Sequence, residues 1–161
     1  MFVTARTTYA MRALVAMAAA GQATTSAPAL AEAERMPFNF LQTVLGDLRR
    51  ARLVVSRRGN DGGYRLARPA AEITVGEVVR AMDAGFAARR EEAGPADSTA
   101  HLDDLWQAAD TALRWVLDET TLDDLTRRRL PAHVRALAGM ARAAGGPNRR
   151  IAIVQDPAGA G

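Results

Sequence analysis

The side chains that most often do chemistry in proteins are scarce in this chain. Its 161 residues include no cysteine, all 21 of its basic residues are arginine, and His101 and His133 are its two histidines. Disulfides, thiolate metal sites, thiol nucleophiles and lysine Schiff bases are therefore excluded. The adjacent carboxylates of Asp103–Asp104 and Asp123–Asp124 point about 100° apart on a helix and do not converge on one ion. We expect no catalytic residue, no metal site, no cofactor and no enzymatic activity.

The arginines indicate a different chemistry, which is the binding of phosphate. Residues 1–70 contain ten arginines and four acids, residues 71–126 contain four and thirteen, and residues 127–161 contain seven and one. A basic first segment beside an acidic middle suggests that the two segments face different partners. Nucleic acid fits the first segment, although arginines scattered over a solvated surface would give the same counts.

The composition is that of an ordinary globular domain that can hold these residues in place. Apolar residues make up 48% of the chain and charged residues 24%, and no apolar run approaches the length of a membrane span. The opening residues imitate a signal peptide, but Tyr9, Ala10, Leu14 and Met17 recur at helical spacing. We therefore expect the first helix of a cytoplasmic protein with no membrane partner.

Two short helices are expected next, separated by Met36-Pro37. The first spans residues 28–35, and the second spans residues 37–51 with Pro37 at its first position. Apolar residues line one face of the second helix: Leu41, Val44, Leu45 and Leu48. Polar and basic residues line its outer face: Asn39, Gln42, Thr43, Arg49 and Arg50. Two helices joined in this way are typical of a helix-turn-helix.

After these helices, the spacing of the apolar residues changes from a helical period to that of a β-hairpin. Residues 53–56 and 64–66 read as strands, and the Gly/Asn/Asp-rich residues 59–63 read as the turn between them. Arg57 and Arg58 lie at the shoulder of this hairpin. A helix-turn-helix followed by such a hairpin predicts a winged helix.

A long amphipathic helix is the main feature of the second half. Thr74 and Glu77 form a capping box for a helix that runs to residue 84. The long helix spans residues 102–119, and its apolar face is too broad for one small core. This face predicts homodimerisation through Leu102, Leu105, Trp106, Ala109, Leu113 and Val116. Trp106 and Trp115 face opposite sides of the helix, so we expect one in the core and one in the dimer interface.

The expected fold class is therefore mainly α with a small β-hairpin wing. The winged helix-turn-helix domain spans residues 1–84, a flexible loop spans 85–101, and the dimerisation helix and C-terminal helices span 102–144. A Gly/Pro/Ala-rich tail follows at 145–161, in which residues 151–154 could pair as an edge strand.

The run from Leu53 to Pro69, followed by residues 72–79, resembles the signature of the Rrf2 family of bacterial transcription regulators, the IscR/NsrR/CymR type. Residues 3–13 and Leu105-Trp106 agree with it, and the resemblance covers roughly residues 1–130. It implies a homodimer that binds a palindromic operator, which we expect to act as a repressor. The long helices of the two copies would cross.

The resemblance also implies roles for residues of the winged helix. The second helix would lie in the major groove, with base edges read by Asn39, Phe40, Gln42 and Thr43. Phe40 would contact a thymine methyl or merely pack. Arg58 would enter the minor groove. The remaining arginines would either contact phosphate or be solvated surface charges: Arg49, Arg50, Arg52 and Arg57.

The sequence departs from the family in two places. Many members ligate an iron–sulfur cluster with three cysteines in the loop before the long helix, and some add a histidine just before Leu-Trp. Here the loop has no cysteine and Asp103 occupies the histidine position, so no cluster is expected. Pro37 replaces the usual serine cap of the reading helix.

Two questions stay open at this point. One is whether the chain is instead a winged-helix protein–protein adaptor that does not bind DNA. The other is whether an unknown small-molecule effector binds between the helix after the wing and the long helix.

Overall fold

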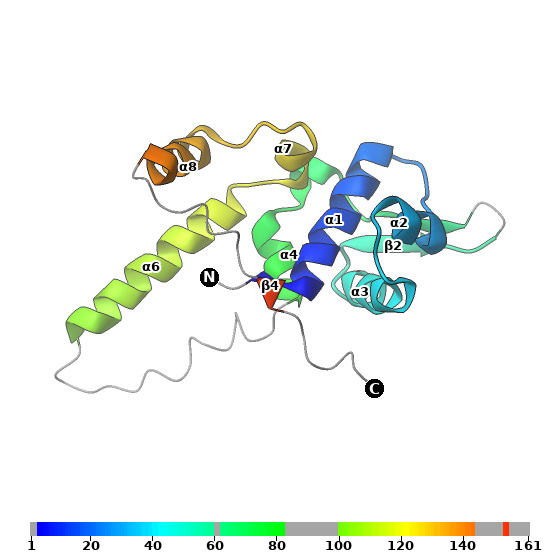
Figure 1. Ribbon diagram of the computed structural model, residues 1–161, viewed down its shortest axis with the longest axis horizontal. Coiled ribbons are helices and arrows are strands. Elements are labelled where there is room, and N and C mark those ends of the chain that lie inside the picture. The colour runs from blue at the N-terminus through cyan, green and yellow to red at the C-terminus, as the bar shows by residue number, and fades with distance from the viewer. Residues whose placement is uncertain (1–2, 60–61, 83–99, 144–152, 155–161) are drawn as a thin grey trace.

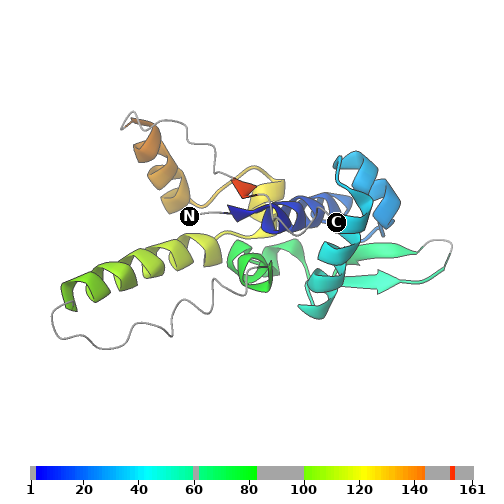
Figure 2. The ribbon, with the colours of Figure 1, turned by 60° about the horizontal axis from the view of Figure 1, so that its bottom comes forward.

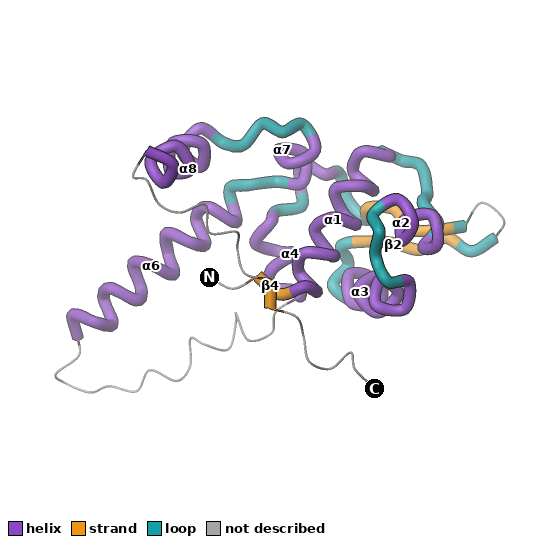
Figure 3. The backbone as a smooth tube through the Cα atoms, in the orientation of Figure 1, coloured by secondary structure: helices purple, strands orange, loops and turns teal. Residues whose placement is uncertain are grey.

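The computed structural model describes residues 3–59, 62–82, 100–143 and 153–154. It is mainly helical with one antiparallel hairpin, which confirms the predicted fold class (Figures 1 and 3). The helices are α1 (Ala5–Ala20), α2 (Ala27–Ala33), α3 (Phe38–Arg50), α4 (Val75–Met82), α6 (Ala100–Asp118), α7 (Leu122–Thr126) and α8 (Ala132–Ala143), with a 3-10 helix at Ala70–Glu72. The strands are β1 (Val3–Thr4), β2 (Val54–Arg57), β3 (Gly63–Leu66) and β4 (Ile153–Val154).

Helix α1 is the centre of the core. It packs against α3, α4, α7 and β3, and its buried face consists mostly of small residues, which lets these neighbours approach closely. The side chains that are fully buried around it come from α1 (Leu14, Met17), α2 (Leu30), α3 (Leu41, Val44, Leu45, Leu48), the hairpin (Val54), α4 (Val78) and the segments beside it (Ile73, Leu122).

Helices α2 and α3 form the expected helix-turn-helix. Ser26 caps α2 by accepting a hydrogen bond of 3.3 Å from the Ala29 N–H, and the chain turns at Arg35, whose φ is +50°. Pro37 was expected at the first position of the second helix, but it is the N-cap of α3 and makes no side-chain cap bond. Because proline has no N–H, it is tolerated at either position.

Buried side chains and backbone hydrogen bonds attach the wing to the core. Strands β2 and β3 pair antiparallel, with Val54 opposite Leu66 and Arg57 opposite Gly63, and Val54 and Leu66 are both buried. Thr25 forms an isolated bridge with Tyr64 on the other side of β3, with N–H···O distances of 2.9 and 2.8 Å. The hairpin is therefore fixed on two sides while its far end projects past α3 (Figure 2).

We expect Gly63→Ala to destabilise the fold. A Cβ at residue 63 would lie 2.6 Å from the carbonyl oxygen of Thr25, so the Thr25–Tyr64 bridge must open or shift, at about 1–3 kcal/mol. Urea unfolding measures this free energy. Gly46→Ala is the matched control, because no atom lies within 4 Å of that Cβ, and it should gain about 0.5–1 kcal/mol within helix α3. Equal stabilities of the two variants would contradict the prediction.

The long helix begins earlier than predicted, and part of the tail forms a strand. Helix α6 begins at Ala100, so the expected loop of residues 85–101 is too long by two residues, and residues 85–99 lie outside the described part. Of the tail, Ile153–Val154 forms β4, which pairs in parallel with β1. Among the described helices, none combines the length and the hydropathy that a membrane span requires.

The expectation that one of the two tryptophans lies in the core is wrong. Trp106 is 65% exposed and Trp115 is 51% exposed. The reason is that, among the described residues, α6 is buried against the winged helix near its C-terminal end, where Leu117 lies, while the rest of the helix projects away from the core (Figure 1). Trp115 instead stacks on His133 of α8.

Candidate nucleic-acid interface

The outer face of α3 is polar, basic and open. Of the residues expected to read bases, Asn39, Gln42 and Thr43 are exposed. The Thr43 hydroxyl donates to the Asn39 carbonyl at 3.3 Å, which fixes its rotamer on the helix surface. Arg49 is exposed at the C-terminal end of the same helix. These groups are available to base edges and phosphates in a groove wide enough to admit a helix.

Two phenylalanines at the start of α3 have different environments. Phe40 is half-buried, and its ring meets the ring of Tyr9 on α1 edge-on, with centroids 5.3 Å apart. Of the two readings that the sequence left open for Phe40, the structure therefore favours packing. Phe38, which the sequence analysis missed, is 40% exposed and lies one helical turn before Gln42. The i, i+4 spacing of Phe38 and Gln42 was the signal that could have found it.

A buried carboxylate ties α3 to α1. The side chain of Asp47 is 5% exposed and is paired with both Arg6 of α1 and Arg50 of α3. Because a buried charge is tolerated only when it is paired and hydrogen-bonded, this cluster adds a specific contact between α3 and α1 to the apolar packing of α3 on the core. Arg50, expected at phosphate, thus also neutralises Asp47, although its own side chain is 77% exposed.

The wing adds positive charge beside α3. Arg57 and Arg58 are both exposed, as is Arg52 in the connection from α3, where it adopts a positive φ of 59°. No ion pair involves these three arginines within the part of the chain that the structure describes. Helix α3 and the wing lie together at one end of the molecule, and α6 projects from the other (Figures 1 and 2).

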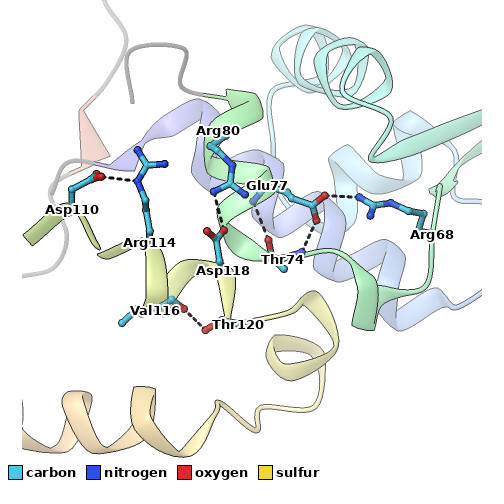
Figure 4. Close-up of polar contacts among 9 residues, drawn as sticks. All are labelled: Arg68, Thr74, Glu77, Arg80, Asp110, Arg114, Val116, Asp118 and Thr120. Atoms are coloured by element: carbon cyan, nitrogen blue, oxygen red, sulfur yellow. Dashed lines mark hydrogen bonds and ion pairs between the residues drawn. The ribbon is translucent and has the colours of Figure 1, made fainter. Parts of the chain in front are cut away.

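A polar network connects the base of the wing to the long helix through α4 (Figure 4). Arg68, just after β3, pairs with Glu77 at 2.8 Å, and Arg80 pairs with Asp118 at the end of α6 at 2.8 Å. Gly76 leaves room for this pair, because a Cβ there would collide with the Asp118 carboxylate. The winged helix and α6 are therefore joined by specific contacts as well as by apolar packing.

Glu77 is the charged member of the capping box at the start of α4. It accepts the Thr74 N–H at 2.9 Å, while its own N–H donates to the Thr74 hydroxyl at 3.2 Å. Burial raises the pKa of this carboxyl, but the hydrogen bond from Thr74 and the guanidinium of Arg68 outweigh burial, so its pKa is lowered overall. Glu77 consequently stays ionised at neutral pH, and the cap and the Arg68 pair form together.

The residues expected at a dimer interface fall into two groups. Leu102, Leu105 and Trp106 are 51%, 57% and 65% exposed, and Ala109 is exposed beside them. Leu113 and Val116 are half-buried within the chain, nearer the contact with α4. The N-terminal half of the predicted face is thus the part that the described residues of the chain leave uncovered.

The sequence left open whether a small-molecule effector binds between α4 and α6. A shallow hollow of about 140 Å³ lies elsewhere, between the end of α1 and the segment that follows the wing. Its lining combines the polar side chains of Gln22, Arg65 and Arg68 with apolar residues such as Leu66 and Pro69, so it is mixed in character.

Comparisons with known proteins agree with this geometry. The profile of the Rrf2 family, described as iron-dependent transcriptional regulators, matches residues 3–128. Rv1287 of Mycobacterium tuberculosis strain H37Rv, provisionally described as an HTH-type transcriptional regulator, is 41% identical over 86% of this chain and 89% of its own length. The regulator IscR of Cereibacter sphaeroides is 31% identical over 76% of this chain and 84% of its own. The structure of CymR, titled the global cysteine regulator of Bacillus subtilis, superposes with a TM-score of 0.70 at 27% identity, over 80% of this chain and 98% of CymR.

The fold and the exposed basic face of α3 and the wing define a winged helix-turn-helix DNA-binding regulator. The chain belongs to the Rrf2 family of transcriptional regulators. Its family and structural relatives are regulators and not enzymes.

The iron in the family's description does not fit the donor set of this chain. Thiolates are absent because there is no cysteine, and among the described residues no three His, Asp or Glu side chains are grouped so that they could hold a metal. Soft, sulfide-bridged iron is held by soft anionic donors. The residues of this chain therefore do not fit an iron–sulfur cluster.

Proposed function

We propose that this protein is a homodimeric repressor that binds a palindromic operator without an iron–sulfur cluster. The observation that carries the proposal is the exposed polar and basic surface of α3 and the wing, with α3 joined to α1 by the buried Asp47. In this proposal residues 1–84 form the DNA-binding domain and residues 102–144 form the dimerisation part. A two-fold dimer would present two recognition helices to successive major grooves, which accounts for a palindromic site.

Base reading is assigned to Asn39, Gln42 and Thr43 of α3. A glutamine side chain pairs bidentately with adenine, and a threonine offers both a hydroxyl and a methyl group. Phe38 joins this set as a candidate contact for a thymine methyl, in place of Phe40. Phosphate contacts are assigned to Arg49, Arg50, Arg52 and Arg57, and minor-groove contact to Arg58.

The experiment that tests this function is an electrophoretic mobility shift with fragments of the source genome, followed by footprinting of the retained fragment. We expect a protected site with two-fold sequence symmetry near a promoter, and less transcription when the protein is present. Absence of any specific fragment would favour the alternative, a winged-helix adaptor that binds protein rather than DNA. Higher transcription with the protein bound would make it an activator.

Gln42→Ala should relax operator specificity at one base pair. The variant should lose about 1–3 kcal/mol of discrimination at that position, because one bidentate pair is removed, while non-specific affinity changes little. Competition binding with operators mutated at each position measures this. Gln107→Ala, which removes an exposed glutamine from α6, is the control and should leave specificity unchanged. If the variant instead loses the same affinity for every operator, whichever base pair is mutated, Gln42 contacts the DNA backbone and not a base.

The purified protein should be colourless, and its operator affinity should not respond to oxygen, nitric oxide or thiol reductants. With no thiolate in the chain, the family's ligand set for a cluster is missing. Anaerobic purification with iron analysis and a visible spectrum checks this. A brown preparation with stoichiometric iron would contradict the prediction.

A further inference from the structure

A buried carboxylate joins two arginines at the border between α1 and α3. Each oxygen of Asp47 accepts from one guanidinium: Oδ2 from Arg6, in the first turn of α1, and Oδ1 from Arg50, the last residue of α3. The Asp47 side chain is 5% exposed, whereas those of Arg6 and Arg50 are 38% and 77% exposed. The carboxylate therefore lies beneath the surface, and both arginine side chains that it holds reach solvent.

This cluster borders the outer face of α3. Thr43 and Arg50 are seven residues apart, so they lie about 20° apart around the helix, and Asp47 lies about 40° from Thr43. Phe40 is seven residues before Asp47 and shares its side of the helix, and the ring of Phe40 packs on α1. Arg6 consequently meets α3 on the side that faces α1, next to the exposed residues that are proposed to read bases.

The cluster has one positive charge in excess, because two guanidinium groups share one carboxylate. Each arginine uses one terminal nitrogen on Asp47, and neither makes another ion pair with a described residue. The Nε of Arg6 is buried, which leaves its terminal nitrogens for a further contact. A guanidinium has five N–H donors in one plane, so both groups retain donors for an anion. A phosphodiester, with one negative charge and two free oxygens, matches this charge and these donors.

We infer that Arg6 and Arg50 together bind one backbone phosphate of the operator, and that Asp47 is the positioning residue that holds them side by side. This inference rests on the proposed function and adds Arg6 and Asp47 to it. A helix in the major groove has a sugar–phosphate backbone along each side, so side chains at the border of its outer face meet phosphate. Without the carboxylate, the two guanidinium groups repel each other and turn apart.

Asp47→Asn separates this positioning role from simple electrostatics, because the two predict opposite signs. The substitution removes a negative charge, and a more positive protein by itself binds DNA more tightly. We expect the affinity instead to fall by about tenfold, on the operator and on unrelated DNA alike, since a lost phosphate contact weakens binding to all sequences. The matched control is Asp123→Asn, which makes the same change of charge and releases Arg127 from an ion pair on α7. This control should bind DNA at least as tightly as the wild type.

Arg6→Gln tests the new contact directly. It should weaken DNA binding by about tenfold, and the slope of log affinity against log salt should become shallower by about one ion. Arg127→Gln removes another ion-paired arginine, on α7, and should leave both quantities unchanged. The double variant Arg6→Gln/Asp47→Asn should lose little more affinity than either single variant, because both residues act in one contact. Fluorescence anisotropy with the full-length protein at several salt concentrations measures these effects, and urea unfolding checks that each variant is folded.

The outcomes separate this inference from the proposed function. A folded Asp47→Asn variant that binds DNA as tightly as the wild type, or more tightly, would overturn the positioning role. Unchanged affinity of Arg6→Gln, or a loss of affinity with an unchanged salt slope, would overturn the phosphate contact. If Asp47→Asn does not fold, the affinity and salt slope of Arg6→Gln decide. A wild-type chain without any specific DNA site would contradict the proposed function itself, whereas an operator-binding wild type with unaffected variants would contradict this inference alone.

Discussion

Leu105→Asp should convert the protein to a monomer at micromolar concentration and abolish specific operator binding. Leu105 is 57% exposed beside Trp106 on the uncovered half of α6, so a charge there would be buried only in the dimer. Central interface side chains commonly contribute about 2–4 kcal/mol, which corresponds to a rise of about 30- to 1,000-fold in the dissociation constant. Light scattering measures the mass, and a mobility shift measures operator affinity.

The matched control for this prediction is Gln107→Asp, which adds the same charge two residues further along α6. Gln107 is exposed, and residues two apart on a helix point in nearly opposite directions. This variant should remain dimeric and bind DNA normally. A monomeric wild type, or equal dissociation of both variants, would refute the interface on α6. Leu105 is a better site for the test than Leu113 or Val116, since those two are half-buried within the chain.

Arg58→Ala should weaken operator binding by about tenfold or more without affecting folding. Its side chain is exposed and makes no ion pair within the described residues, so the free energy of unfolding should change by no more than about 0.5 kcal/mol. A guanidinium in the minor groove releases counterions, so the slope of affinity against salt should also become shallower by about one ion. Mobility shifts at several salt concentrations measure both effects.

The control removes the same charge far from the proposed DNA surface. Arg129→Ala removes an exposed arginine from the connection between α7 and α8, away from α3 and the wing (Figure 1). It should leave the salt dependence of operator binding unchanged. Wild-type affinity and slope in Arg58→Ala would show that the wing does not touch DNA. A similar loss in both variants would mean that net charge, rather than a local contact, governs binding.

The elements whose causes are local are predictable from the sequence alone. The spacing of Leu41, Val44 and Leu48 predicted the buried face of α3, and all three are fully buried. Thr74 with Glu77 predicted the start of α4, and both hydrogen bonds of that capping box are present. Such signals act within about four residues of the chain, because helix period and capping bonds span one turn. The absence of cysteine is also evident from the sequence, and it excludes the thiolate chemistry of the family before the structure is known.

Contacts between residues far apart in the sequence become evident only in the folded structure. The fold buries Asp47 between Arg6 and Arg50, packs Phe40 on Tyr9 while leaving Phe38 exposed, and places Trp115 against His133 rather than in the core. Each contact joins helices whose relative orientation depends on the packing of the whole core. Periodicity gives the face of a helix on which a side chain lies, but not which neighbour covers that face, because coverage is fixed only when all the elements pack together.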